Sequence, residues 1–195
     1  MGKMKIPEED KKELLKLARE SIRTVLDNEE LRINNELKKK YSKKQGVFVT
    51  LNTKTGELRG CIGYPEPIMP LWRGIINAAR AAAFEDPRFY PITKEELKDI
   101  IIEISILTPP ELIKVKHPIE YLNKIKIGED GLIIRGPFGS GLLLPQVFIE
   151  YNATPEQALR MVCQKAMLPS NAWQDLRNKI YKFQAEVFSE KEIFE

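Results

Sequence analysis

The sequence predicts an α+β fold built mainly on an antiparallel sheet packed with helices. Strand-like runs at 46–51 and 57–62 follow one another across a short turn, which is typical of a hairpin. Most strand-like runs are not separated by the regular helical crossovers that parallel strands require. Apolar residues recur at helical spacing in segments 14–26, 71–83 and 159–167, and these predict helices that pack on the sheet.

Length and charge narrow the function classes. The 195 residues can bury a sizeable core and suit one domain, or one large and one small lobe. With 31 basic and 28 acidic residues, the net charge of +3 gives no electrostatic footprint for wrapping nucleic acid. The lysines of segment 38–44 favour a solvated helix end and loop over an anionic-partner patch, so nucleic acid ranks last among the partners.

The apolar runs of the chain and its cysteine and histidine content indicate where the protein is located and which cofactors it holds. No apolar run approaches the roughly 20 residues that cross a bilayer, and the acidic N-terminal segment lacks the apolar core of a signal peptide. We therefore expect a cytoplasmic protein without a membrane span. Two cysteines and one histidine do not make a multi-ligand zinc site of the usual kind, so neither a metal nor another cofactor is expected. A disulfide between Cys61 and Cys163 is disfavoured in a reducing cytosol.

Start and stop signals assign the other elements. Pro7 and the acidic residues after it predict a helix that runs to about Leu26. Pro70 opens an alanine-rich helix, whose small side chains indicate a very close approach to a sheet. Segment 99–107 is rich in isoleucine and predicts a central strand. Segment 179–187 predicts one strand with a single buried face, formed by Tyr181, Phe183, Ala185 and Val187.

Three chemically suggestive features have simpler structural interpretations. His117 is the one histidine, and a loop histidine without a paired carboxylate is more often incidental than catalytic. Segment 136–141 has glycines at the spacing of a phosphate-binding loop, but leucines stand where lysine and serine or threonine are needed, so a hairpin turn is expected. Cys163 lies in the apolar stripe of a helix that starts at Thr154, which predicts a small core residue.

The densest cluster of unusual residues is segment 58–63, with the sequence LRGCIG. Strand alternation places Arg59 and Cys61 on one face and Gly60 on the other. This segment, together with the DPRF sequence at 86–89 and the GLLLPQV sequence at 141–147, resembles the AMMECR family over nearly the whole chain. The prokaryotic members of that family are also called AmmeMemoRadiSam system protein A.

The resemblance implies a particular architecture and set of partners. Residues 1–195 would form a single AMMECR-type domain of two intertwined subdomains, the larger an antiparallel sheet with helices and the smaller mostly β. The LRGCIG motif would lie near a groove between them. Memo-type and radical-SAM proteins are the implied partners, and the family supplies no established reaction.

Two hypotheses for the function follow from the motif. In the first, the chain is a binding module whose groove holds a small anionic ligand or a peptide. Its candidate binding residues are Arg59, Gly60, Gly63, Asp86, Arg88 and Gln146. In the second, it is an enzyme or covalent carrier whose nucleophile is the Cys61 thiol, activated by Arg59. The first is favoured because the sequence places no base near the thiol.

Overall fold

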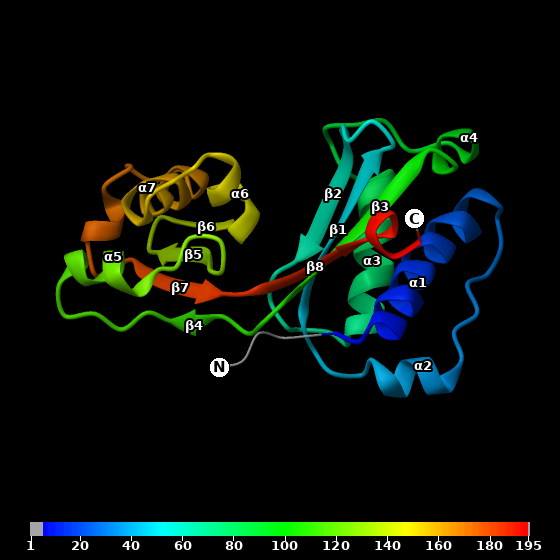
Figure 1. The fold of residues 1–195 in the computed structure, drawn as a ribbon, viewed down its shortest axis with the longest axis horizontal. Helices are drawn as coiled ribbons and strands as arrows, with labels where there is room; N and C mark the ends of the chain where they lie inside the picture. Colours follow the sequence, from blue (N-terminus) through cyan, green and yellow to red (C-terminus); the bar gives the residue numbers. More distant parts are fainter. Residues whose placement is uncertain (1–5, 195) are drawn as a thin grey trace. The chain divides into compact units, whose positions relative to one another are not determined.

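The computed structural model describes residues 6–194, and these divide into two compact units. The larger unit comprises residues 6–107 and 186–194, and the smaller unit comprises residues 108–185. The first and last described residues therefore belong to the larger unit, while the middle of the chain forms the smaller one. The ribbon is drawn in Figure 1.

The larger unit contains a four-stranded sheet in the order β2-β1-β3-β8. Strand β1 (Gly46–Thr53) pairs antiparallel with both β2 (Leu58–Tyr64) and β3 (Ile100–Leu107), and β8 spans Ala185–Ser189. This arrangement confirms the α+β class, the hairpin and the interior position of the isoleucine-rich strand. It also makes β2, which carries the LRGCIG motif, an edge strand.

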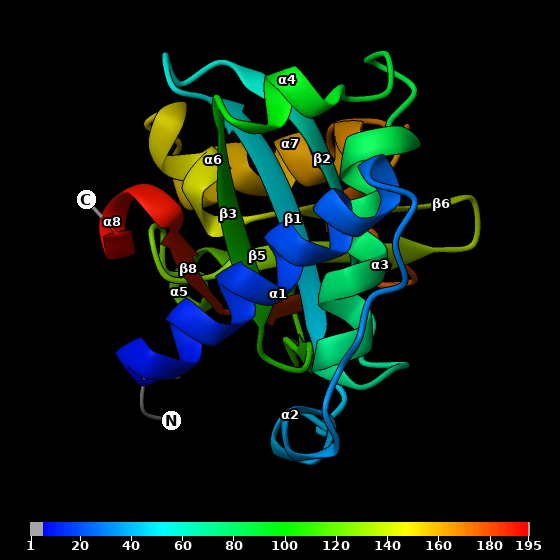
Figure 2. The ribbon, with the colours of Figure 1, turned by 90° about the vertical axis from the view of Figure 1, so that its right-hand side faces the viewer.

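Helices α1 (Glu8–Leu26) and α3 (Leu71–Phe84) cover one face of this sheet (Figure 2). Shorter helices are α2 (Asn35–Lys40), α4 (Lys94–Leu97) and α8 (Glu190–Phe194). The buried alanines of α3 confirm the predicted close approach, since a Cβ atom added to Gly60 on β2 would lie 2.2 Å from the backbone oxygen of Ala82. Glycine at position 60 is therefore a packing requirement.

A partly buried ion pair connects the C-terminal helix α8 to α1. Arg19 on α1 donates from Nε to Glu190 Oε1 at 2.6 Å, and its other nitrogens donate to the carbonyls of Leu97 and Ile100 at 2.9 and 2.7 Å. Glu190 also accepts a hydrogen bond from the backbone N–H of Ile102 at 2.8 Å. The two charged groups are thus surrounded by hydrogen-bond partners, which offsets the cost of burying them.

The smaller unit contains a second four-stranded sheet in the order β4-β7-β5-β6, with antiparallel pairing. Its strands are β4 (Glu111–Leu112), β5 (Gly131–Gly136), β6 (Gly139–Leu143) and β7 (Lys179–Phe183). Its helices are η1 (Pro118–Glu120), α5 (Tyr121–Lys124), α6 (Pro145–Glu150), α7 (Pro155–Lys165) and η2 (Ala172–Gln174). The glycine-rich segment 136–141 is the β5–β6 hairpin turn, as predicted.

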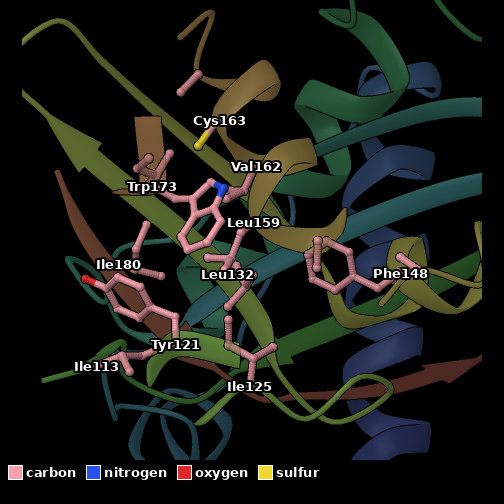
Figure 3. Packing of buried hydrophobic residues seen from close by; sticks show 14 residues of the cluster. Ile113, Tyr121, Ile125, Leu132, Phe148, Leu159, Val162, Cys163, Trp173 and Ile180 are labelled. Atoms are coloured by element: carbon pink, nitrogen blue, oxygen red, sulfur yellow. The ribbon is translucent and has the colours of Figure 1, made fainter. Parts of the chain in front are cut away.

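Apolar side chains from the sheet and from α7 form the core of the smaller unit (Figure 3). Cys163 is fully buried there beside Trp173, which confirms its expected role as a small core residue. Burial raises the pKa of the Cys163 thiol. Cys163 and Cys61 are both free cysteines.

The prediction of one continuous strand over 179–187 is wrong. The chain forms two strands, β7 and β8, which belong to different sheets and are separated at Gln184. Gln184 donates its backbone N–H to Thr108 Oγ1 at 2.8 Å instead of continuing a ladder. The predicted buried face is also wrong in part, because Ile180 and Phe188 are buried whereas Val187 is 38% exposed.

In the described part of the chain, no helix combines the length and the apolar character needed to cross a membrane.

Candidate functional site

The backbone of Cys61 on the edge strand β2 is hydrogen-bonded to side chains of the loop that follows α3. Asp86 Oδ2 accepts a hydrogen bond from the Cys61 N–H at 2.9 Å. Arg88 Nη2 donates to the Cys61 carbonyl oxygen at 3.4 Å. These two side chains therefore occupy the hydrogen-bonding positions that a neighbouring strand would fill, and they protect the sheet edge at this residue.

Asp86 and Arg88 are themselves tightly connected. Asp86 Oδ1 accepts from the Arg88 N–H at 3.1 Å and from Arg88 Nε at 3.0 Å, while Oδ2 accepts from Arg88 Nη2 at 2.7 Å. The Asp86 side chain is 2% exposed and that of Arg88 is 53% exposed. The hydrogen bonds from Arg88 hold the pKa of the Asp86 carboxyl well below its usual range, although burial opposes this shift. Asp86 is thus a buried carboxylate that anchors a half-exposed guanidinium.

Arg59 lies on the same strand, two residues before Cys61, and is paired with α4. Its Nη2 lies 3.0 Å from Glu96 Oε1, and its Nε donates to the same oxygen at 3.1 Å. The Arg59 side chain is 15% exposed, and its Nη1 atom is buried without a hydrogen-bond partner among the described residues. The positive charge is therefore already compensated, but one donor group of the guanidinium is unused.

The aromatic ring of Phe89 is close to the guanidinium groups of both Arg59 and Arg88. Its centroid is 5.8 Å from the guanidinium carbon of Arg59 and 5.5 Å from that of Arg88. These distances are within the range of cation–π contacts, which restrict the orientation of both guanidinium groups. We call Arg59, Cys61, Asp86, Arg88 and Phe89 the Cys61 cluster.

The thiol of Cys61 is half-buried, and its described hydrogen bond comes from a hydroxyl group. Thr50, the cross-strand neighbour on β1, donates from Oγ1 to Sγ at 3.4 Å. Within residues 6–194, no imidazole or carboxylate is hydrogen-bonded to this sulfur; Asp86 bonds to the backbone instead. Arg88 is electrostatically coupled to Cys61, since Asp86 and, more weakly, Cys61 raise the pKa of Arg88.

Of the other candidate residues, Gly63 has a packing role, whereas Gln146 and His117 lie in the smaller unit. Gly63 is also a packing residue, because an added Cβ atom would lie 2.3 Å from the ring of Phe48. Gln146 lies on α6 in the smaller unit, and His117, also in that unit, is exposed and donates its backbone N–H to Glu120. Among the described residues, no group of three or more histidine, cysteine or acidic side chains is arranged to hold a metal ion.

Sequence reasoning missed three participants in this site. Glu96 forms a capping box with Thr93 at the start of α4, and its ion pair with Arg59 depends on where α4 lies relative to β2. Phe89 belongs to the DPRF segment, but its contact with Arg59 is a tertiary one. Thr50 could have been found from the hairpin register, since it lies opposite Cys61.

Comparison with known proteins places this geometry in a family. The AMMECR1 family model matches residues 15–188, a range that includes β2, the loop after α3 and the β5–β6 hairpin. The chain belongs to the AMMECR1 family. This membership confirms the resemblance that was drawn from segments 58–63, 86–89 and 141–147.

Relatives in the family cover most of the chain. Protein MJ0810 of Methanocaldococcus jannaschii is 56% identical over 153 residues, which is 78% of this chain and 76% of that protein. Protein NEQ441 of Nanoarchaeum equitans is 46% identical over 178 residues, with 91% and 98% covered. The crystal structure of the uncharacterised protein PH0010 from Pyrococcus horikoshii superimposes with a TM-score of 0.83 at 45% identity, covering 90% of this chain and 89% of that chain.

Proposed function

We propose that this AMMECR1-family chain is a binding module and that a small anionic group or a peptide contacts it at the Cys61 cluster. The observation that supports this most directly is the pair of arginines around Phe89. Both guanidinium groups are held by a carboxylate, yet Arg59 Nη1 has no partner among the described residues and Arg88 is half-exposed. A guanidinium fixed in this way binds a carboxylate or phosphate with little further loss of side-chain entropy.

The charge balance of the cluster limits what it would bind. Arg59 is neutralised by Glu96, and Arg88 is neutralised by Asp86. A polyanion would therefore gain little, because each positive charge is already compensated by a neighbouring negative charge. A ligand with a single carboxylate, or a peptide that also uses its backbone groups, fits better.

The alternative function is an enzyme or covalent carrier with Cys61 as a reactive thiol. The proposal that Arg59 activates this thiol loses support, because the Arg59 charge is engaged by Glu96. The contact that Arg88 makes with Cys61 is to the backbone carbonyl oxygen and not to the thiol. Asp86 would be a poor base for the thiol because its pKa is held low. The binding function is therefore preferred.

Two further proposals accompany the binding function. We propose that residues 1–195 act as one AMMECR1-type domain in the cytoplasm, where a reducing environment suits two free cysteines. We also propose Memo-type and radical-SAM proteins as the partner classes. A peptide-binding surface around Cys61 would give such a partner a point of attachment.

The binding function is tested with small monoanions, for which acetate and acetylglycine are suitable probes. We expect at least one of them to shift the side-chain Nε–H resonances of Arg59 and Arg88 in NMR spectra. Arg88→Gln should weaken that binding by about tenfold. Arg160→Gln is the matched control, because Arg160 also pairs with a carboxylate but lies on α7. If the probes cause the same shifts in Arg88→Gln, the Cys61 cluster is not their binding site.

Thiol chemistry distinguishes the two functions. Alkylation with iodoacetamide is followed by mass spectrometry, and the fully buried Cys163 serves as an internal reference in the same molecule. The binding function predicts that Cys61 reacts no faster than an ordinary exposed thiol and that Cys61→Ser retains ligand binding. Stoichiometric alkylation much faster than that of a free cysteine at neutral pH would instead favour the enzyme or carrier.

A further inference from the structure

A second surface of the larger unit concentrates positive charge at the start of α3. Segment 41–44 runs beside this end of the helix, where Trp72 N–H donates to the Tyr41 carbonyl at 3.3 Å and Leu71 N–H donates to the Lys43 carbonyl at 2.9 Å. Figures 1 and 2 both place α2, which precedes this segment, next to the beginning of α3. The charged groups of Lys38 and Arg73 lie near the Trp72 ring, and the backbone of Lys43 and Lys44 runs beside the start of α3. We call these four residues the basic cluster.

The cations of the basic cluster form no ion pair with a described carboxylate. In the part of the chain that the structure describes, none of the four is within ion-pair distance of a carboxylate, whereas Lys40 on α2 contacts both Asp10 and Glu13. The first turn of α3 also contains no acidic residue, so the positive end of the helix dipole adds to the same charge. A surface of this kind attracts an acidic partner and repels a basic one.

Trp72 links the basic cluster to a hollow in the surface. Its ring centroid lies 5.7 Å from Lys38 Nζ and 5.1 Å from the guanidinium carbon of Arg73, so two cations flank the indole. Trp72 and Arg73 also line a hollow of about 450 Å³. Its other lining residues include four aliphatic side chains: Val25, Leu31, Ile33 and Ile76. Val25 is 41% exposed, so apolar surface is available in this hollow.

From this combination we infer that the surface binds an acidic amphipathic segment of a partner protein. An apolar side chain of the partner would enter the hollow, and its carboxylates would face the basic cluster. Amphipathic helices dock in grooves in this way, with apolar anchors in the groove and charged residues at the rim. This surface shares no residue with the Cys61 cluster, so the inference does not depend on the proposed function.

The same residues disfavour a nucleic acid as the occupant. Glu29 and Glu30 also line the hollow, and a uniformly negative phosphate backbone that crossed it would approach these carboxylates. A peptide can place an apolar or basic side chain at that point.

The test uses a fluorescein-labelled synthetic helix with glutamates along one side and leucines along the other. Its dissociation constant is measured by fluorescence anisotropy with the full chain. We expect the double variant Lys38→Glu/Arg73→Glu to weaken binding by at least about tenfold, because two attractions become repulsions. Val25→Asp should also weaken binding, since it places a charge in the hollow. Binding should change the intrinsic fluorescence of the wild type, and Trp72→Phe should lose this change while the buried Trp173 remains.

The matched control is Lys98→Glu/Lys191→Glu, which changes the net charge equally at exposed positions elsewhere on the larger unit. We expect it to leave the dissociation constant within about twofold, and thermal melting shows whether each variant is folded. The inference is overturned if this control weakens binding as much as the first pair, or if the wild type does not bind the peptide. It is also overturned if an oligothymidine of equal charge or a phosphatidylglycerol vesicle binds more tightly than the peptide and if the double variant Lys38→Glu/Arg73→Glu abolishes that binding.

Discussion

The carboxylate of Asp86 takes the place of a neighbouring strand for Cys61, accepting the backbone N–H at 2.9 Å while Arg88 donates to the carbonyl oxygen of the same residue. An edge strand normally leaves such groups open to water or to another chain. Here the N–H and carbonyl groups of Cys61 are hydrogen-bonded to two side chains of a loop more than twenty residues further along the chain. The DPRF segment therefore has a structural role at the motif. It also fixes the half-exposed guanidinium of Arg88 next to the backbone of Cys61.

Replacing Asp86 by asparagine tests this role. The amide keeps the shape of the side chain but removes the charge, so the hydrogen bonds from Arg88 and from the Cys61 N–H lose their charge assistance. We expect a loss of about 1–3 kcal/mol in the free energy of unfolding, measured by urea denaturation. Asp99→Asn is the control, since Asp99 is exposed and paired with Lys54, and it should cost less than about 1 kcal/mol. Equal effects of the two substitutions would show that Asp86 contributes no more than a surface charge.

The same carboxylate gives stability a defined dependence on pH. The pKa of Asp86 is lowered in the folded protein, chiefly by the hydrogen bonds from Arg88, relative to an unfolded value of about 3.9. Its contribution is therefore present above that value and is lost as the pH falls below about 4 toward the folded-state pKa. We expect the stability difference between the wild type and Asp86→Asn to be constant from about pH 5 to 7 and to shrink below pH 4. A difference that grows on acidification would contradict the assigned ionisation.

Gly60→Ala should be strongly destabilising. The added Cβ atom would lie 2.2 Å from the backbone oxygen of Ala82, a distance that forces β2 and α3 apart. We expect a loss of about 1–3 kcal/mol, seen as a lower urea midpoint. Because the obstructing atom belongs to the backbone, the second substitution Ala82→Gly should not restore stability. Rescue by that substitution would mean that the side chain, and not the oxygen, sets the distance between strand and helix.

The secondary structure of the larger unit was predictable where local chemistry decides it. The isoleucine-rich strand and the alanine stripe of α3 are both short-range signals, and each matches the structure. The strand at 179–187 was mispredicted because alternation alone cannot show that a chain changes sheets. The hydrogen bond from Gln184 N–H to Thr108 Oγ1 that marks this change joins residues distant in sequence.

The candidate site was predictable as a location but not as a set of contacts. Family motifs and strand alternation brought Arg59, Cys61 and Arg88 into one hypothesis, and the structure places the two arginines beside Phe89. The alternation could not tell which arginine is engaged elsewhere. Glu96 neutralises Arg59 through the position of α4, a tertiary relationship that no spacing in the sequence encodes.

Met167 provides a prediction in the smaller unit that is independent of the site. It follows the C-cap of α7 with φ of 56°, and the N–H of Leu168 donates to the Cys163 carbonyl at 3.0 Å, as in a Schellman motif. Glycine is the usual residue at this position because a Cβ atom is unfavourable in the left-handed region. The Met167 side chain is 93% exposed, so it loses almost no packing when it is removed.

We therefore expect Met167→Gly to stabilise the chain by about 1 kcal/mol, measured as a higher urea midpoint with an unchanged slope. Asn152→Gly is the matched comparison, since Asn152 also has a positive φ, of 48°, but asparagine tolerates this conformation better than methionine. Its gain should be smaller. If Met167→Gly is neutral or destabilising, the greater freedom of glycine in the unfolded chain outweighs the relief of backbone strain, and the strain assigned to Met167 is too large.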